Sequence, residues 1–314
     1  MSIKANFLIG GAPKCGTTSL ANYLRDHPQI FLSEIKEPFY FADDLPRLRE
    51  KTRVQTSEQY AALFAGADDR CRAVGEGSTL YLFSESAIEN ALAYNPAMKF
   101  VFMVRHPVEV AHAFHMQMRF HEYEPLESFE AAWRDLPRRR LDPAVLPKRC
   151  LEPSMVDYDC IAAMGTQLDR AMTLIPPDQR LVLCFDDLKA DAGQVYRRTL
   201  GFLNVDDDRR GSFGKDNAAM KSRFPIVTRA LRHHWVVSAS LMTKRRLRGR
   251  WYRIARQTKH SLMFRRAERP TLSAEFRREL QEHFLSEIEL LEDLLKRDLS
   301  SWKRDPSGEP QNVL

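Results

Sequence analysis

A glycine-rich turn near the start of the chain limits its fold more than any other feature. The apolar run Phe7-Leu8-Ile9 leads into the turn, and Leu20, Tyr23 and Leu24 follow it at helical spacing. This order predicts a strand, a tight turn and a helix. Glycine lets the backbone approach an anion closely, and the N–H groups at a helix start favour negative charge. An ordinary strand-to-helix turn would need neither the lysine nor the two threonines of residues 14–18, so we expect a phosphate-binding loop.

The spacing within this loop distinguishes it from the loop that binds nucleoside triphosphates. In the triphosphate pattern, G-x-x-x-x-G-K-[ST], a lysine directly follows the second glycine and reaches the β- and γ-phosphates. Gly11 and Gly16 have the required separation, but Thr17 occupies the lysine position and Lys14 lies inside the loop. The pattern therefore indicates a phosphate ester shorter than a triphosphate.

With these residues, the stretch from Gly10 to Leu20 resembles the 5′-phosphosulfate loop of sulfotransferases, above all the bacterial and carbohydrate branch. The resemblance implies that the donor substrate is 3′-phosphoadenosine 5′-phosphosulfate (PAPS). It also implies that Lys14 stabilises the departing 5′-phosphate as its bond to sulfur breaks, and that no metal is required. The residues that the resemblance assigns to donor binding are Gly11, Lys14, Cys15, Gly16, Thr17 and Thr18.

A second motif carries the expected base. Lys36-Glu37-Pro38 is followed by the aromatic run Phe39-Tyr40-Phe41. From the residues alone, this segment is a surface loop anchored by its aromatic side chains. K-E-P followed by aromatics also recurs in the same sulfotransferase branch, where its glutamate is the usual candidate for the base that deprotonates the acceptor hydroxyl. The resemblance therefore implies that Glu37 is the general base.

A third motif follows a buried strand. Residues 99–104 form the short apolar run that is typical of a strand in a parallel sheet, and Arg105 comes directly after it. Arg105-His106-Pro107 matches the sulfotransferase 3′-phosphate motif, R-x-P-x-x-x-x-x-S, whose serine position is Ala113 here. The resemblance implies that Arg105 binds the 3′-phosphate of the donor. It assigns further basic contacts with this phosphate to Lys221 and Arg223.

Short buried strands alternate with helical patterns along the chain, which indicates a parallel sheet wound on both faces. The expected fold class is α/β, a P-loop-like parallel β-sheet flanked by helices, with a helical C-terminal extension. We expect one sulfotransferase domain over residues 1–314. Its parts are a nucleotide-binding α/β core over 1–210, a basic lid-like segment over 211–270 and one long C-terminal helix within 271–300. Because parallel strands end at a common edge, residues that follow them can gather there.

The net charge of +6 is unevenly distributed. Residues 221–270 contain fifteen Lys and Arg residues against one acidic residue, Glu268. Such a block is most often a solvated helical face. The alternative is a lid, or a surface for an anionic acceptor or a membrane. No homeodomain, zinc-finger or RNA-recognition signature accompanies the charge, so we expect no nucleic-acid partner.

Other patterns favour a structural interpretation. Asp186 and Asp187 follow an apolar strand, as the carboxylates of a magnesium site do, but an acidic-Leu turn in this place is common in the sulfotransferases and largely structural. The five cysteines are scattered, which favours neither a zinc site nor a disulfide framework. The start of the chain lacks the pattern of a signal peptide, and no stretch approaches the roughly 18 apolar residues of a membrane span. We therefore expect a cytoplasmic protein.

The resemblance implies transfer of a sulfuryl group from PAPS to a hydroxyl of a glycan or small-molecule acceptor. Two alternatives stay open: a P-loop kinase that uses ATP and Mg²⁺, and a nucleotide-binding protein with impaired catalysis. The displaced lysine disfavours the kinase. Two departures from the sulfotransferase pattern hint at impaired catalysis: Ala113, and Gly77 at a position where some carbohydrate enzymes have lysine. A histidine near Arg105, namely His106, His112 or His115, is the alternative to Glu37 as base.

Overall fold

The computed structural model describes residues 3–214, 220–222, 264–266 and 270–304. The chain divides into two compact units, Met1–Asp216 with Ser273–Leu314, and Asn217–Leu272. The first unit contains the expected phosphate-binding loop, the K-E-P motif and Arg105. The expected division of a single domain at residues 210 and 270 stays a prediction.

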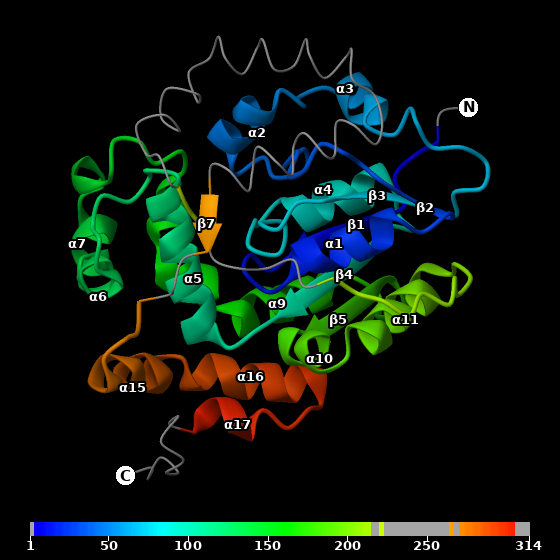
Figure 1. Ribbon diagram of the computed structural model, residues 1–314. Coiled ribbons are helices and arrows are strands. Elements are labelled where there is room, and N and C mark those ends of the chain that lie inside the picture. Colours follow the sequence, from blue (N-terminus) through cyan, green and yellow to red (C-terminus); the bar gives the residue numbers. More distant parts are fainter. Residues whose placement is uncertain (1–2, 215–219, 223–263, 267–269, 305–314) are drawn as a thin grey trace. The chain divides into compact units, whose positions relative to one another are not determined.

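The first unit is built on a five-stranded sheet with the strand order β2-β3-β1-β4-β5, in which every pairing is parallel (Figure 1). The strands are β1 (Phe7–Gly11), β2 (Ile30–Leu32), β3 (Ala73–Gly77), β4 (Lys99–Val104) and β5 (Arg180–Cys184). All five residues of β1 are buried, because this strand lies at the centre of the sheet. The loop that follows β1 therefore lies between the carboxyl ends of β3 and β4. This confirms the predicted α/β fold with a parallel sheet.

Helices cover both faces of this sheet. The helix α1 packs against α11, and α4 packs against α9, which also contacts the C-terminal helix α16 (Figure 1). The helices are α1 (Thr17–Arg25), α2 (Pro46–Thr52), α3 (Ser57–Ala62), α4 (Ala87–Tyr94), α5 (Pro107–Phe120), α6 (Phe129–Arg134), α7 (Leu136–Leu141), α8 (Tyr158–Ala162), α9 (Met164–Leu174), α10 (Phe185–Ala190), α11 (Ala192–Leu203), α15 (Ala274–His283), α16 (Leu285–Leu295) and α17 (Ser300–Lys303). Short 3₁₀ helices are Pro143–Val145, Pro153–Val156 and Pro177–Gln179. None of the helices in the described part of the chain has both the length and the apolar character needed to cross a bilayer.

The C-terminal extension consists of consecutive helices rather than the one long helix that the sequence predicts. The interruption is at Phe284, whose φ and ψ are −91° and 9°. Its ring is buried and makes an edge contact with Trp133, with 5.6 Å between the ring centres. Packing of this ring against α6 therefore accompanies the local departure from helical geometry.

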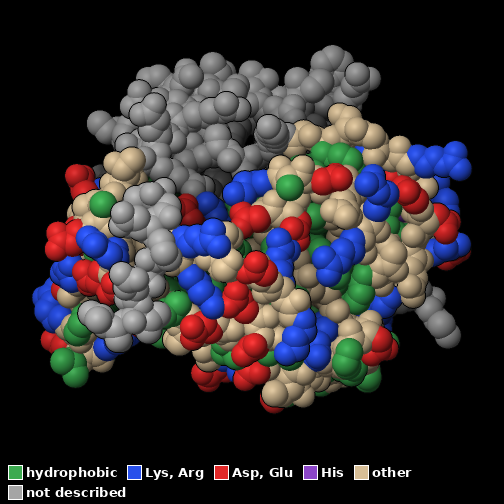
Figure 2. Space-filling view, turned by 90° about the horizontal axis from the view of Figure 1, so that it is seen from below, with side chains coloured by type: hydrophobic (Ala, Val, Ile, Leu, Met, Phe, Trp, Pro, Cys, Tyr) green, Lys and Arg blue, Asp and Glu red, His purple; other side chains and the backbone are tan. Residues whose placement is uncertain are grey.

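The acidic pair after β5 anchors this extension to the sheet. Asp187 accepts two hydrogen bonds from the Arg297 guanidinium, at 2.5 and 2.7 Å, and Asp186 accepts one from Trp302 Nε1 at 2.8 Å. Both carboxylates lie in α10 rather than in a turn. Figure 2 views this side of the molecule from below and shows positive and negative side chains interspersed on it. Arg134–Glu279 and Lys303–Glu292 are further ion pairs of these helices.

The described part of the second unit includes one pair of strands. The strand β6 (Met220–Ser222) pairs antiparallel with β7 (Phe264–Arg266). Lys221 belongs to β6, opposite Arg265 in the register, whereas Arg223 lies outside the described residues. Most of the basic segment 221–270 also lies outside them. The roles expected for these residues in donor binding, as a lid, or toward an anionic acceptor or a membrane stay predictions.

Candidate functional site

The loop between β1 and α1 has the geometry of an anion cradle. Gly11 has a φ of 155°, and a Cβ atom there would lie 2.7 Å from Cβ of Leu82. Gly16 has a φ of 92°, and a Cβ atom there would lie 2.8 Å from the Phe185 ring. Only glycine fits either position without strain. Gly16, the N-cap residue of α1, makes no side-chain cap, an arrangement that suits an anion at the start of a helix.

Lys14 and Cys15 contribute to this loop in different ways. Lys14 has a positive φ of 65°, and its carbonyl oxygen accepts a hydrogen bond from Arg105 Nη1 at 3.2 Å. The Cys15 side chain is buried, with its Sγ 3.4 Å from the Pro13 carbonyl oxygen. Burial raises the pKa of the Cys15 thiol, which keeps it protonated. Cys15 can therefore serve a phosphate through its backbone N–H, but not as a nucleophile.

Arg105 links the loop to the first turn of α5. Its guanidinium lies over the Phe185 ring, 4.6 Å from the ring centre, and Nη2 donates to Glu109 Oε2 at 3.1 Å. The other Glu109 oxygen accepts from Arg277 of α15 at 2.9 Å. Two arginines thus flank one carboxylate beside the loop. The sequence does not indicate Arg277, because it lies about 170 residues from Arg105 and in a different motif.

Ala113 is buried within α5, at the position where the 3′-phosphate motif has serine. His112, its neighbour, is also buried and stacks on Phe129 with 5.3 Å between ring centres. The His112 ring therefore packs against the first residue of α6.

The K-E-P segment joins β2 to α2 and meets the loop from the other side. The Glu37 N–H donates to the Gly77 carbonyl oxygen at 3.0 Å, and Thr79 Oγ1 donates to Glu37 Oε1 at 3.1 Å. The Glu37 side chain is 30 % exposed. Lys36 Nζ lies 3.9 Å from Glu37 Oε1 and donates to Thr18 Oγ1 at 2.8 Å. The structure therefore places Glu37 beside the loop between β1 and α1, with Lys36 between them.

A buried polar group behind this segment holds its backbone. Ser78 Oγ accepts from the Phe39 N–H at 3.1 Å and donates to Glu76 Oε2 at 2.9 Å. The Tyr81 hydroxyl accepts from the Phe41 N–H at 3.4 Å. Glu76 is completely buried, and burial raises the pKa of its carboxyl to about 7. The Glu76 carboxyl is therefore largely protonated below neutral pH.

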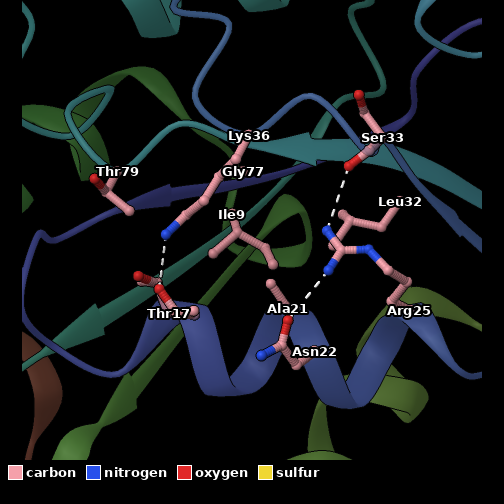
Figure 3. A pocket seen from close by; sticks show the side chains of 11 residues that line it. Ile9, Thr17, Ala21, Asn22, Arg25, Leu32, Ser33, Lys36, Gly77 and Thr79 are labelled. Carbon is pink, nitrogen blue, oxygen red and sulfur yellow. Dashed lines mark hydrogen bonds between the residues drawn. The ribbon is translucent and has the colours of Figure 1, made fainter. Parts of the chain in front are cut away.

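The two loops border a pocket (Figure 3), formed by the first turns of α1 and the ends of β1, β2 and β3. Its lining residues are Ile9, Thr17, Thr18, Ala21, Asn22, Arg25, Leu32, Ser33, Lys36, Gly77 and Thr79. Figure 3 shows the Lys36 side chain extending from the K-E-P segment to the start of α1. Lys36 and Thr79 were not among the expected site residues. Their positions beside Glu37 and after β3 were visible in the sequence, but their contacts depend on how the two loops fold together.

The three histidines near Arg105 are engaged elsewhere. His106 Nδ1 accepts a hydrogen bond from the Val108 N–H, and Nε2 lies 3.0 Å from the Trp302 carbonyl oxygen. The tautomer with its proton on Nε2 donates to this oxygen. His115 Nε2 lies 3.0 Å from the Leu126 carbonyl oxygen. Burial lowers the pKa of both imidazoles. This geometry favours Glu37 over these histidines as the candidate base.

No protein-family model matches the chain. Its sequence is 27 % identical, over 203 residues, to the human bifunctional heparan sulfate N-deacetylase/N-sulfotransferase 3, an alignment that covers 63 % of this chain and 22 % of the human protein. It is 24 % identical, over 268 residues, to mouse carbohydrate sulfotransferase 15, with 70 % of this chain and 46 % of the mouse protein covered. The chain therefore spans less than half the length of these relatives.

Among solved structures, the fold is similar to that of a sulfotransferase from Alicyclobacillus acidocaldarius. The TM-score is 0.69 at 24 % sequence identity, and the match covers 96 % of this chain and all of the bacterial one. The likeness extends over both the sheet and the C-terminal helices. The chain therefore has the fold of this bacterial sulfotransferase and a distant sequence similarity to two carbohydrate-modifying sulfotransferases.

Proposed function

We propose that the protein transfers a sulfuryl group from PAPS to an acceptor hydroxyl. The observation that carries this proposal is the meeting of two loops at one sheet edge. One loop is a glycine cradle that lacks the lysine of a triphosphate site, and the other presents Glu37 toward it. Sulfuryl transfer needs a held phosphate leaving group on one side of sulfur and a base on the other, and this arrangement supplies both.

The donor would be held by its two phosphate groups. The positive φ values at Gly11 and Gly16, and the uncapped start of α1, fit a 5′-phosphate bound to backbone N–H groups of residues 15–18. Lys14 would stabilise the bridging oxygen, where negative charge develops as the bond to sulfur breaks. Arg105, joined to the same loop through the Lys14 carbonyl, would bind the 3′-phosphate.

Glu37 would act on the acceptor. Its carboxylate accepts a hydrogen bond from Thr79, which leaves its remaining lone pairs for an acceptor hydroxyl. In the transfer, the acceptor oxygen forms a bond to sulfur, the bond from sulfur to the 5′-phosphate oxygen breaks, and the hydroxyl proton passes to Glu37. General-base assistance of this kind contributes roughly 10²–10⁴-fold to the rate.

A kinase is disfavoured by the acidic pair after β5. The Arg297 guanidinium binds both Asp187 oxygens, and Asp186 accepts from Trp302 and pairs with Lys189. A magnesium site would require these carboxylates to leave ion pairs that anchor the C-terminal helices. Both sequence relatives are named for reactions on carbohydrate, so we propose a glycan hydroxyl as the first acceptor class to examine. A cytoplasmic location stays a prediction.

The test is transfer of label from ³⁵S-PAPS to a panel of desulfated glycans, simple sugars, phenols and alcohols, with and without EDTA. Label should appear in at least one acceptor, and EDTA should not reduce it. Transfer of phosphate from ATP, abolished by EDTA, would replace the proposal with a kinase. Tight PAPS binding with no transfer to any acceptor or to water would indicate a binding protein.

A further inference from the structure

Lys36 makes a contact that the proposed mechanism does not use. Its side chain leaves the K-E-P segment and crosses the pocket to donate to Thr18 Oγ1 at 2.8 Å (Figure 3). Thr18 is the second residue of α1, so this ammonium lies beside the N–H groups that form the phosphate cradle. A positive charge next to the positive end of a helix is unfavourable unless an anion lies between them.

An ordinary surface ion pair does not explain this position. Lys36 Nζ is 3.9 Å from Glu37 Oε1, and its side chain is 51 % exposed. Exposed pairs at this distance contribute little to stability, about 0–1 kcal/mol. The shorter contact is with the neutral hydroxyl of Thr18, toward the loop rather than toward the carboxylate. The geometry is that of a cation that spans the gap between the donor loop and the base.

We propose that Lys36 is the second cation of the transfer site, contacting the sulfuryl oxygens while Lys14 contacts the leaving phosphate. This inference rests on the proposed function. In the reaction, sulfur moves from the 5′-phosphate oxygen to the acceptor oxygen, so it passes between the donor loop and Glu37, where the Lys36 ammonium lies. Lys36 keeps its proton throughout, and the acceptor proton goes to Glu37.

The pocket offers a second position from which a lysine could supply the same charge. Gly77 lines the pocket, and its carbonyl oxygen accepts the Glu37 N–H at 3.0 Å. A Cβ atom at Gly77 would meet only the Ile9 side chain, at 3.8 Å, which is ordinary contact. A lysine introduced here begins beside Glu37 and faces the space that Lys36 crosses. Moving the charge from one position to the other separates the effect of charge from the effect of local structure.

The experiment uses the full chain with ³⁵S-PAPS and follows release of labelled sulfate to water, which needs no identified acceptor. The variants are Lys36→Met, Lys36→Arg, and Lys36→Met combined with either Gly77→Lys or Gly77→Met. Lys148→Met removes an exposed lysine outside the pocket and serves as the control. Binding of adenosine 3′,5′-bisphosphate, which lacks the sulfuryl group, is measured in parallel.

Lys36→Met should lower the rate of sulfuryl release by roughly 10²-fold, as loss of one preorganised cation at developing charge does. Affinity for the bisphosphate should change little. Lys36→Arg, and Gly77→Lys in the Lys36→Met background, should each recover activity well above the methionine controls. Lys148→Met should match the wild type.

Three results would overturn the inference. Lys36→Met could leave the rate of sulfate release unchanged. It could weaken binding of the bisphosphate by the same factor as it lowers that rate. Finally, neither cationic variant could exceed the activity of its methionine control. Failure of the proposed function looks different. In that case the wild-type chain itself neither binds PAPS nor releases sulfate from it.

Discussion

The two sides of the pocket are built in different ways. On the donor side, the cradle is made by backbone within one strand-loop-helix unit, from β1 to α1. On the base side, Phe39, Phe41 and Glu37 are held by side chains of the segment after β3, about 40 residues further along. A local motif can be recognised from spacing alone. A loop held by distant hydroxyls depends on the whole fold, so its variants should affect geometry as well as chemistry.

The sharpest test of the base side is Glu37→Gln, which keeps the shape of the side chain but cannot accept a proton. We expect the rate of transfer to a hydroxyl acceptor to fall by roughly 10²–10⁴-fold. Affinity for adenosine 3′,5′-bisphosphate should be unchanged, because the donor side does not depend on this carboxylate. The measurements are kcat with labelled PAPS and calorimetric binding of the bisphosphate.

His112→Asn and His115→Asn are the controls for this assignment. Both side chains are packed away from the loop, and both variants should keep substantial activity. If the glutamine variant stays active while one of these loses activity, the base is that histidine.

On the donor side, Lys14→Ala should lower kcat by roughly 10²–10³-fold, because its charge matters most as the phosphate leaves. The Kd for the bisphosphate product should rise much less, since that ligand carries no developing charge. Steady-state rates and product titration compare the two effects. A loss of affinity for the bisphosphate as large as the loss in kcat would count against a role of Lys14 that is specific to the transition state.

Arg105→Ala should have a smaller effect, confined to donors that carry a 3′-phosphate. Loss of a charge-assisted hydrogen bond corresponds to about 1.5–3 kcal/mol, or roughly 10- to 150-fold in affinity. Adenosine 5′-phosphosulfate, which lacks the 3′-phosphate, should bind the variant and the wild type alike. If the affinity for both nucleotides falls equally, Arg105 acts through its hydrogen bond to the Lys14 carbonyl and its role is structural.

The smallest effect on turnover is expected for Glu76→Gln. This variant tests the base side of the pocket through the pH dependence of the unfolding free energy instead. The pKa of Glu76 is about 7 in the folded chain against 4.5 in the unfolded chain, so the folded state binds the extra proton between these values. Stability from this group is therefore complete below pH 4.5 and is lost as pH rises to 7, by about 3 kcal/mol. The glutamine variant should lack this loss.

Urea unfolding of both proteins at pH 5 and pH 8 measures the difference. The His106 and His115 pKa values are lowered, which makes stability rise with pH in both proteins, so only the difference between them reports Glu76. An unfolding free energy that changes equally with pH in the two proteins would contradict the prediction.

The sequence predicts the local parts of this structure well. Residues 99–104 form a strand with the expected bounds, and α1 begins at Thr17, within the end of the expected loop. In these places periodicity, glycine and capping preferences act within a few residues. The parallel sheet and the edge at which the motifs meet follow from the alternation of strands and helices.

The parts that sequence reasoning missed depend on tertiary packing. The strand β2 is three residues long, which is too short to show a period, and α2 begins at a proline after an irregular segment. Residues 127–139, in which Phe129, Ala132 and Trp133 recur at helical spacing, are divided into α6 and α7 at Asp135, whose carboxylate pairs with Arg138 and Arg139. The contact between Lys36 and Thr18 joins two loops whose approach no local pattern encodes.

The bonds between α10 and the C-terminal helices have a consequence for biosynthesis. The segments that follow β4 and β5 contact the donor loop through Arg105 and Phe185, and their other side chains are held by Trp302 and Arg297. During translation, β4 leaves the ribosome about two hundred residues before these partners do. The nascent chain therefore carries the nucleotide motifs long before it can fix them in place. Competence for donor binding should arise late, as the last helices emerge.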